Sequence, residues 1–202
     1  MKKYLDLLRV KQWVKNAFIF LPYFFDGNTL DSSTIMNLML GFFAFSGVTS
    51  SIYVLNDIID RRDDENHPLK KHRPIAAKKI TLKRAGIIGI LVLSISLIYF
   101  FNFERDALFF VLAYVIIMIL YCFYFRKVSI VDVLFISIGF VLRLFIGGEI
   151  SSTKISLWII LMVFLLSLFI AFSKRRDDLI NGNSSFRESL LGYNLSFINT
   201  VI

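Results

Sequence analysis

The chain has 202 residues, of which 56% are hydrophobic and 16% aromatic, and it carries a formal net charge of +8. A water-soluble domain is usually about 45–50% apolar, so this composition argues against an ordinary soluble protein and favours a membrane protein. A positive charge can also indicate a nucleic-acid-binding protein. Here, however, the apolar residues form long blocks with the basic residues between them, so we expect a lipid bilayer and no nucleic acid as partner.

Six apolar segments are candidates for membrane-spanning helices, because a helix needs roughly 20 apolar residues to cross a bilayer. The first segment is short and contains Pro22, but no cleavage site of small residues follows it, so we interpret it as a span and not as a signal peptide. The sequence therefore predicts an all-α, multi-span transmembrane helix bundle. The six segments are 14–25, 33–55, 85–103, 106–125, 130–148 and 155–173.

The last apolar segment, FRESLLGYNLSFINTVI at 186–202, predicts the start of a seventh span. A bundle that ends partway through a span leaves backbone groups unsatisfied in lipid. We therefore expect residues 1–202 to form a single integral-membrane domain that is truncated at its C-terminus. The single cysteine, Cys122, lies inside a span and is expected to pack as a small apolar residue.

The basic residues predict the orientation of the bundle. When the six segments are threaded in order, one side of the membrane receives every Lys and Arg except Arg105, Arg143 and Lys154. Cytoplasmic loops carry an excess of positive charge. The sequence thus predicts a multi-pass protein of the cytoplasmic (inner) membrane with a cytoplasmic N-terminus, and it leaves the oligomeric state open.

The stretch NDIIDRRDD at 56–64 concentrates acidic side chains at the end of the second span. On a continuous helix Asp57 and Asp64 lie about 20° apart in projection, Asp60 lies about 60° away, and Asn56 is one turn before Asp60. These four side chains are predicted to face one cavity and to bind Mg²⁺, which prefers oxygen ligands and bridges carboxylates to substrate phosphates. The alternative is a solvated helix end in which acids and bases pair at i,i+4.

The next stretch, HPLKKHRPIAA, supplies positive charge beside those acids. His67 and Arg73 each precede a proline, which disfavours the helical conformation, so the chain is expected to fold back over the helix end. Lys70 and Arg73 can neutralise phosphate oxygens, Arg73 with a bidentate fork. Acids for a cation beside bases for anions predict a metal–diphosphate site.

Three further groups of charges complete the pattern. A second acid–base cluster, SKRRDDL at 173–179, ends the last span on the same side and adds Asp178 as a candidate metal ligand. Arg126 and Lys127 end the fourth span at the depth of a lipid headgroup, where long basic side chains reach the interface.

Asp132 and Arg143 share a face but lie about 16 Å apart along a helix, so we expect no direct pair. We expect Arg143 to hold the bundle interior through a buried acid or backbone carbonyls.

These motifs resemble the UbiA superfamily of intramembrane prenyltransferases, whose first Asp-rich motif matches Asn56, Asp57, Asp60 and Asp64. A closer resemblance is to its branch of polyprenyl-phosphate phosphoribosyltransferases, the decaprenyl-phosphate enzymes. One departure is Lys78, where the branch commonly has glycine. The motifs of the branch match QWVKN at 12–16, HPLKKHRPIA at 67–76, GFVLRLFIG at 139–147 and KRRDDL at 174–179.

The resemblance implies a helical bundle around a lipid-lined cavity, and a transferase. It implies Mg²⁺-dependent transfer of 5-phosphoribose from phosphoribosyl diphosphate to a polyprenyl phosphate at the cytoplasmic membrane face, with release of diphosphate. Asp57 and Asp60 are then the candidate catalytic residues. The candidate donor-binding residues are Lys15, His67, Lys70, Arg73, Lys174 and Arg175. The candidate acceptor-binding residues are Tyr121, Arg126 and Lys127.

Other functions remain open from the sequence. An aromatic prenyltransferase of the same superfamily, with a polyprenyl diphosphate donor, needs the same metal–diphosphate site. A transporter or channel would need polar residues along a path, and only Asp132 and Arg143 could serve. A structural membrane protein, or an inactive fragment of either enzyme, is compatible with the expected truncation.

Overall fold

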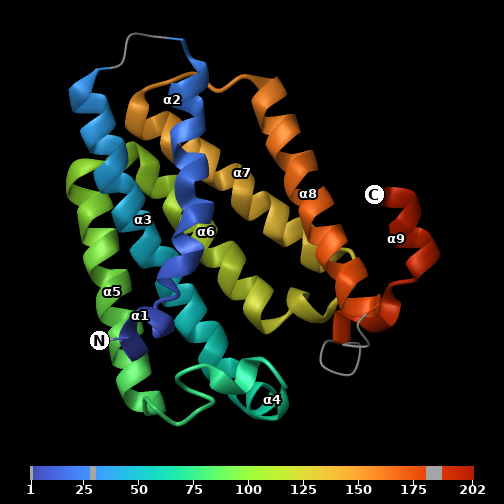
Figure 1. The fold of residues 1–202 in the computed structure, drawn as a ribbon. Coiled ribbons are helices and arrows are strands. Elements are labelled where there is room, and N and C mark those ends of the chain that lie inside the picture. Colours follow the sequence, from blue (N-terminus) through green and yellow to red (C-terminus); the bar gives the residue numbers. More distant parts are fainter. Residues whose placement is uncertain (1, 28–30, 181–187) are drawn as a thin grey trace.

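The computed structural model describes residues 2–27, 31–180 and 188–202, and these residues form helices joined by turns and loops, without a strand among them. Figure 1 shows the helices gathered side by side into a bundle. Five of them are long and apolar enough to cross a membrane, which confirms five of the six predicted segments as apolar helices of spanning length. The five are α3 (Ser32–Ile59), α5 (Leu82–Phe103), α6 (Arg105–Phe123), α7 (Val131–Ser151) and α8 (Leu157–Ile180).

The first predicted segment is helical but is not one of those five. It forms the 3₁₀ helix η1 (Val10–Phe20) and the short helix α2 (Leu21–Phe25), with Pro22 in the first turn of α2. Both pieces lie against α7, and η1 also packs on α3. A Cβ atom on Gly147 would come within 1.9 Å of the Ile19 carbonyl oxygen, so glycine is required where η1 meets α7. The predicted count of six spans is not confirmed.

The ends of the described chain are short helices. The N-terminal α1 (Lys2–Leu7) precedes η1, and η5 (Glu188–Gly192) and α9 (Leu195–Val201) follow α8. With seven residues α9 is too short to cross a bilayer. The predicted seventh span is therefore not confirmed either.

Capping side chains set where the long helices begin. Asp31 accepts a hydrogen bond from the Thr34 backbone N–H at 2.9 Å at the start of α3. Thr81 accepts one from the Arg84 backbone N–H at the start of α5. Such caps satisfy N–H groups that have no partner within the helix.

The far end of α3 departs from the sequence prediction. Asp60 separates α3 from the short helix α4 (Arg61–Asn66), with φ of −83° and ψ of 2°. The prediction of one helical face from residue 56 to residue 64 assumed a continuous helix and is wrong in this respect.

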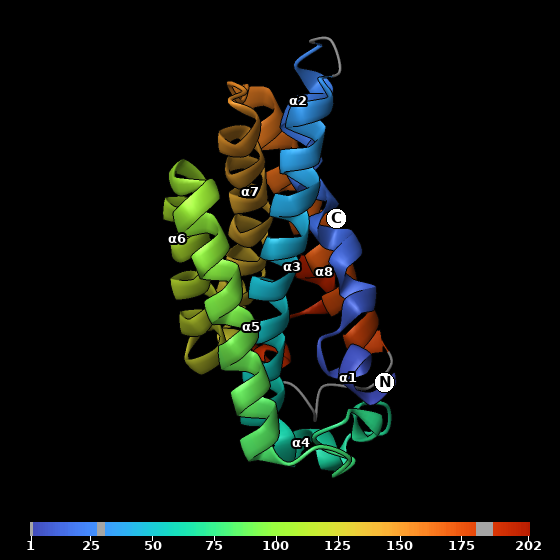
Figure 2. The ribbon, with the colours of Figure 1, turned by 90° about the vertical axis from the view of Figure 1, so that its left-hand side faces the viewer.

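Figures 1 and 2 place α4 and α1 at one end of the bundle and α2 at the other. The 3₁₀ turns η2 (Lys70–His72) and η3 (Phe125–Lys127) complete the described helices.

Candidate active site

A cavity of about 900 Å³ opens among the helices and holds most of the predicted site residues. Its apolar wall includes Ile52, Met118 and Phe140, whereas its polar wall carries side chains of both charges. All predicted site residues line it except Asp57 and Asp178. The predicted site residues that line the cavity are Lys15, Asn56, Asp60, Asp64, His67, Lys70, Arg73, Tyr121, Arg126, Lys127, Lys174 and Arg175.

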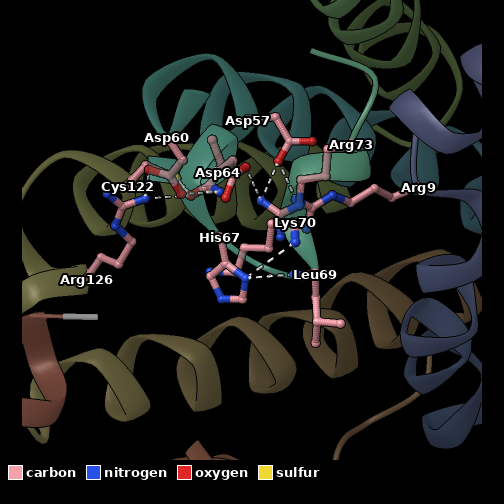
Figure 3. Close-up of polar contacts among 11 residues, drawn as sticks. Arg9, Asp57, Asp60, Asp64, His67, Leu69, Lys70, Arg73, Cys122 and Arg126 are labelled. Carbon is pink, nitrogen blue, oxygen red and sulfur yellow. Dashed lines mark hydrogen bonds and ion pairs between the residues drawn. The ribbon is translucent and has the colours of Figure 1, made fainter. Parts of the chain in front are cut away.

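One polar cluster joins the end of α3 to the end of α6. The Asn56 side-chain amide donates to Asp60 Oδ2 at 3.0 Å, and Arg126 forms an ion pair with the other Asp60 oxygen. Arg126 also donates to Asn56 Oδ1 at 3.3 Å, and the Cys122 Sγ lies 3.7 Å from that oxygen. Arg126, predicted to bind the acceptor, thus contacts a predicted metal ligand (Figure 3). Cys122, predicted only to pack, lies on the cavity wall.

A second cluster fixes Asp57 and Asp64. Arg73 Nη1 lies 3.1 Å from Asp57 Oδ1 and 2.6 Å from Asp64 Oδ2. Arg9 forms a further ion pair with Asp57 (Figure 3). The second Asp57 oxygen is buried, and it has no hydrogen-bond partner among the described residues. Asp57 therefore faces arginines instead of the cavity, while Asp64 reaches the cavity wall.

The site predicted from the sequence does not include Arg9. It lies at the break between α1 and η1 with φ of +48°, and its guanidinium stacks over the Tyr53 ring. The signal that could have identified it is its place three residues before the QWVKN motif, within an amphipathic basic segment.

The charges of the two clusters balance. Three carboxylates, on Asp57, Asp60 and Asp64, meet three guanidinium groups, on Arg9, Arg73 and Arg126. Burial raises the pKa of the Asp64 carboxyl, and the charge of Arg73 opposes this rise. A cation that binds the carboxylates would release guanidinium groups to bind an anion.

The residues fit Mg²⁺ only together with a phosphate ligand. Among the described residues, no group of three or more His, Cys, Asp and Glu side chains could hold a metal ion. Asn56, Asp60 and Asp64 nevertheless present amide and carboxylate oxygens to one cavity. Mg²⁺ commonly takes one or two carboxylates and completes its shell with water and substrate phosphates. Asp178 does not line the cavity, and its oxygen lies 3.8 Å from Arg175.

The turn over the helix end is organised by His67. Its Nδ1 accepts hydrogen bonds from the backbone N–H groups of Leu69 and Lys70, at 3.2 and 3.4 Å. Burial lowers the pKa of the His67 imidazole, and the positive charge of Lys70 lowers it further. The predicted fold-back thus carries Lys70 and Arg73 to the acidic helix end, as Figure 3 shows.

The two charges inside the membrane helices do not pair with each other. Asp132 accepts hydrogen bonds from Arg175 Nε at 2.8 Å and from the Tyr193 hydroxyl at 2.6 Å. The Arg143 guanidinium donates to Asn16 Oδ1 at 3.0 Å and to the Gly139 carbonyl oxygen at 2.6 Å. Arg143 therefore holds the bundle interior through a backbone carbonyl and a side-chain amide. No carboxylate among the described residues pairs with it.

Arg175 combines two features. It lines the cavity, as a predicted donor-binding residue should, yet its side chain is only 1% exposed and is held by Asp132. Lys174, next to it, is exposed on the same wall. The position of Lys174 leaves it more accessible to a ligand than Arg175.

The sequence matches a known protein family and named relatives. Residues 18–192 match the model of the UbiA prenyltransferase family. The chain is 30% identical over 201 residues to decaprenyl-phosphate phosphoribosyltransferase from Corynebacterium glutamicum, a match that covers 96% of this chain and 60% of the relative. It is 28% identical to the protein of the same name from Mycolicibacterium smegmatis, covering 96% of this chain and 63% of the relative. The chain thus spans less than two thirds of the length of these two relatives.

A solved structure shares the fold. A UbiA homologue from Archaeoglobus fulgidus, bound to GPP and Mg²⁺, superposes with a TM-score of 0.82 and covers 98% of this chain and 72% of the other. Its sequence is only 19% identical, so the likeness concerns the fold alone. Because the family model matches most of the chain, residues 18–192, the chain is a member of the UbiA prenyltransferase family.

Proposed function

We propose that this protein transfers a 5-phosphoribosyl group from phosphoribosyl diphosphate to a polyprenyl phosphate, with Mg²⁺ as cofactor. The main support for this proposal is the set of residues that line the large cavity. Asn56, Asp60 and Asp64 line its wall together with a group of basic residues, and an apolar wall continues from them. The names of the Corynebacterium and Mycolicibacterium relatives support this choice of substrates.

In the proposed reaction an oxygen of the acceptor phosphate forms a bond to C1 of the ribose, and the bond from C1 to the diphosphate breaks. Bound Mg²⁺ would neutralise the charge of the leaving diphosphate. Asn56, Asp60 and Asp64 are the residues that would hold the cation. Arg73 and Arg126, which neutralise carboxylates in the structure, would then bind phosphate oxygens.

The rest of the cavity suits a lipid acceptor. Ile52, Met118 and Phe140 offer an apolar surface for isoprene units and would exclude water from C1. Lys127 and Tyr121 line the cavity near the end of α6, where the acceptor phosphate would lie. Because most basic residues gather at this end of the bundle, we place it at the cytoplasmic face of the inner membrane.

A second candidate is prenyl transfer from a polyprenyl diphosphate to an aromatic acceptor. The observation that favours it is the bound GPP and Mg²⁺ in the structurally similar Archaeoglobus protein. The same oxygen ligands and arginines would bind the diphosphate of either donor. The two reactions differ in which substrate carries the apolar chain. In prenyl transfer it is the donor, and in phosphoribosyl transfer it is the acceptor.

Membranes containing the protein, incubated with each labelled donor, distinguish the two functions. The proposal predicts Mg²⁺-dependent transfer of label from phosphoribosyl diphosphate into the lipid fraction when polyprenyl phosphate is present. The Asp60→Asn variant should lose this transfer, whereas Asp177→Asn, which changes an exposed carboxylate outside the cavity, should keep it. Label moving only from a prenyl diphosphate to an aromatic acid would reject the first function in favour of the second.

A further inference from the structure

A second cavity, of about 300 Å³, lies apart from the active site. It is formed between α1 and the turn that leads from η2 to α5. Its lining residues do not line the large cavity, so the proposed reaction does not use them. They are Lys2, Lys3, Asp6, His72, Pro74 and Lys79.

The backbone around this cavity is fixed by packing. Leu7 at the end of α1 is fully buried and belongs to the same apolar cluster as Ile75 and Ile80. The Pro74 carbonyl oxygen accepts hydrogen bonds from the backbone N–H groups of Lys79 and Ile80, at 2.9 and 3.2 Å. The lysines on both walls are therefore carried by anchored segments that keep the two walls together.

The charges in the cavity favour an anion. Lys2, Lys3 and Lys79 bring three positive charges, against one negative charge from Asp6. All three lysines are exposed, so a ligand can reach them. Among biological anions, a phosphate group can accept hydrogen bonds from several ammonium groups at once.

The position of the cavity indicates where the anion comes from. Lys79 lies three residues before Leu82, the first residue of the apolar helix α5, and thus at the membrane boundary. On α1 the side chains of Tyr4 and Leu5 are 40% and 54% exposed beside the lysines. Exposed aromatic and aliphatic side chains next to lysines are typical of a helix that lies in the lipid interface.

We propose that this cavity binds the phosphate headgroup of an anionic phospholipid. The three lysines would contact the phosphate, and Tyr4 and Leu5 would contact the adjoining acyl chains. Lipid is favoured over a soluble phosphate because only a lipid also uses this exposed apolar surface.

Lipid binding to the detergent-purified protein, counted by native mass spectrometry, tests the proposal. Phosphatidylglycerol should bind more tightly than phosphatidylcholine. Replacing Lys2, Lys3 and Lys79 together by Gln should weaken phosphatidylglycerol binding by about fivefold for each lysine, roughly a hundredfold in total. Asp6→Asn should strengthen binding about fivefold by the same reasoning, a gain that a poorly folded variant would not show.

The matched control replaces Lys11, Lys71 and Lys83 by Gln, which removes the same charge from exposed positions outside both cavities. This variant should retain most of the phosphatidylglycerol affinity. Equal losses in the two triple variants would overturn the proposal in favour of unspecific charge attraction. Competition by millimolar inorganic phosphate that abolishes lipid binding would also overturn it, because the cavity would then be a site for a soluble anion.

Discussion

Asp57 holds two arginines in place. It is buried, and one of its oxygens binds both Arg9, at the break between α1 and η1, and Arg73, in the turn after α4. Arg73 also binds Asp64 on the cavity wall. Asp57 thus determines where these guanidinium groups lie, and we infer that it supports the site by positioning them.

Replacing Asp57 by Asn should therefore lower stability. The variant removes the negative charge between two guanidinium groups, and breaking a buried ion pair from one side typically costs 3–5 kcal/mol. Because Arg9 and Arg73 are 20% and 25% exposed, we expect a smaller loss in free energy of unfolding, about 2 kcal/mol. Denaturant unfolding in detergent measures the free energy of unfolding. The control is Asp177→Asn, which should change this free energy by less than about 0.5 kcal/mol. An Asp57→Asn protein of normal stability that fails only to bind metal would identify Asp57 as a ligand instead.

Lys78 adopts a backbone conformation that favours glycine. Its φ is +57°, in the left-handed region, at the position where the resemblance to the phosphoribosyltransferase branch leads us to expect glycine. Lys78→Gly should raise the free energy of unfolding by about 1 kcal/mol, because the side chain no longer strains this conformation. Thermal unfolding measures the change. Ala77→Gly, at a position without positive φ, should lower stability, and a loss of the same size in Lys78→Gly would contradict this explanation.

At the scale of elements, the turn between α4 and α5 depends on a neutral imidazole. His67 accepts two backbone hydrogen bonds through Nδ1, and protonation there would break both. Burial lowers the pKa of His67 below its ordinary value of 6.5, so the folded state binds fewer protons than the unfolded chain. The stability that neutral His67 contributes is therefore fully present above about pH 6.5 and is lost as the pH falls below this value.

His67→Asn should remove this acid sensitivity, because the amide oxygen can accept a hydrogen bond but does not titrate. The measurement compares melting temperatures at pH 7.5 and 5.5 for the wild type and the variant. His72, the only other histidine of the chain, is exposed, so His72→Asn should keep the wild-type response. An identical pH response in all three proteins would show that His67 does not couple the turn to pH.

The segment after α8 is joined to the start of α7 by buried polar groups. The Tyr193 hydroxyl donates to Asp132 at 2.6 Å and accepts the Ile130 backbone N–H at 2.7 Å. Ile130 has φ of +68°, a strained value for a β-branched residue, so its surroundings must hold it there. These contacts fix the segment between η5 and α9 at the start of α7.

Tyr193→Phe should loosen this junction. The variant leaves a buried carboxylate oxygen and a backbone N–H without this partner, which costs about 1–3 kcal/mol in free energy of unfolding. Hydrogen exchange should increase first in residues 188–202. Tyr124→Phe, at a largely exposed tyrosine, is the control and should change neither quantity. Unaltered exchange in Tyr193→Phe would contradict the role given to the hydroxyl.

The elements differ in how far the sequence predicts them. The five long helices follow from apolar length, which the bilayer requires. The break at Asp60 could not be predicted from the sequence, because residues 56–66 contain neither Gly nor Pro and their pattern is that of one continuous helix. In the folded protein Asp60 forms an ion pair with Arg126, and Asp64 forms one with Arg73. A local sequence pattern carries no information about such distant partners.

For the whole molecule, the sequence indicates which charges share one end of the bundle but not which of them meet. Arg9 and Asp57 are 48 residues apart, and Arg126 and Asp60 are 66 residues apart. These pairs depend on how η1, α3 and α6 pack. The predicted single domain and its inner-membrane location stay predictions, whereas the helical bundle and the family are established.

The proposed function requires that the polar wall of the large cavity recognises a diphosphate together with Mg²⁺. Isothermal titration calorimetry measures this recognition as the affinity of the purified protein for phosphoribosyl diphosphate, once with Mg²⁺ and once with a chelator. We predict at least about tenfold tighter binding with Mg²⁺, a difference of about 1.4 kcal/mol. This gain should disappear in Asp60→Asn and persist in Asp177→Asn. Equal affinity with and without Mg²⁺, or an undiminished gain in Asp60→Asn, would contradict the claim.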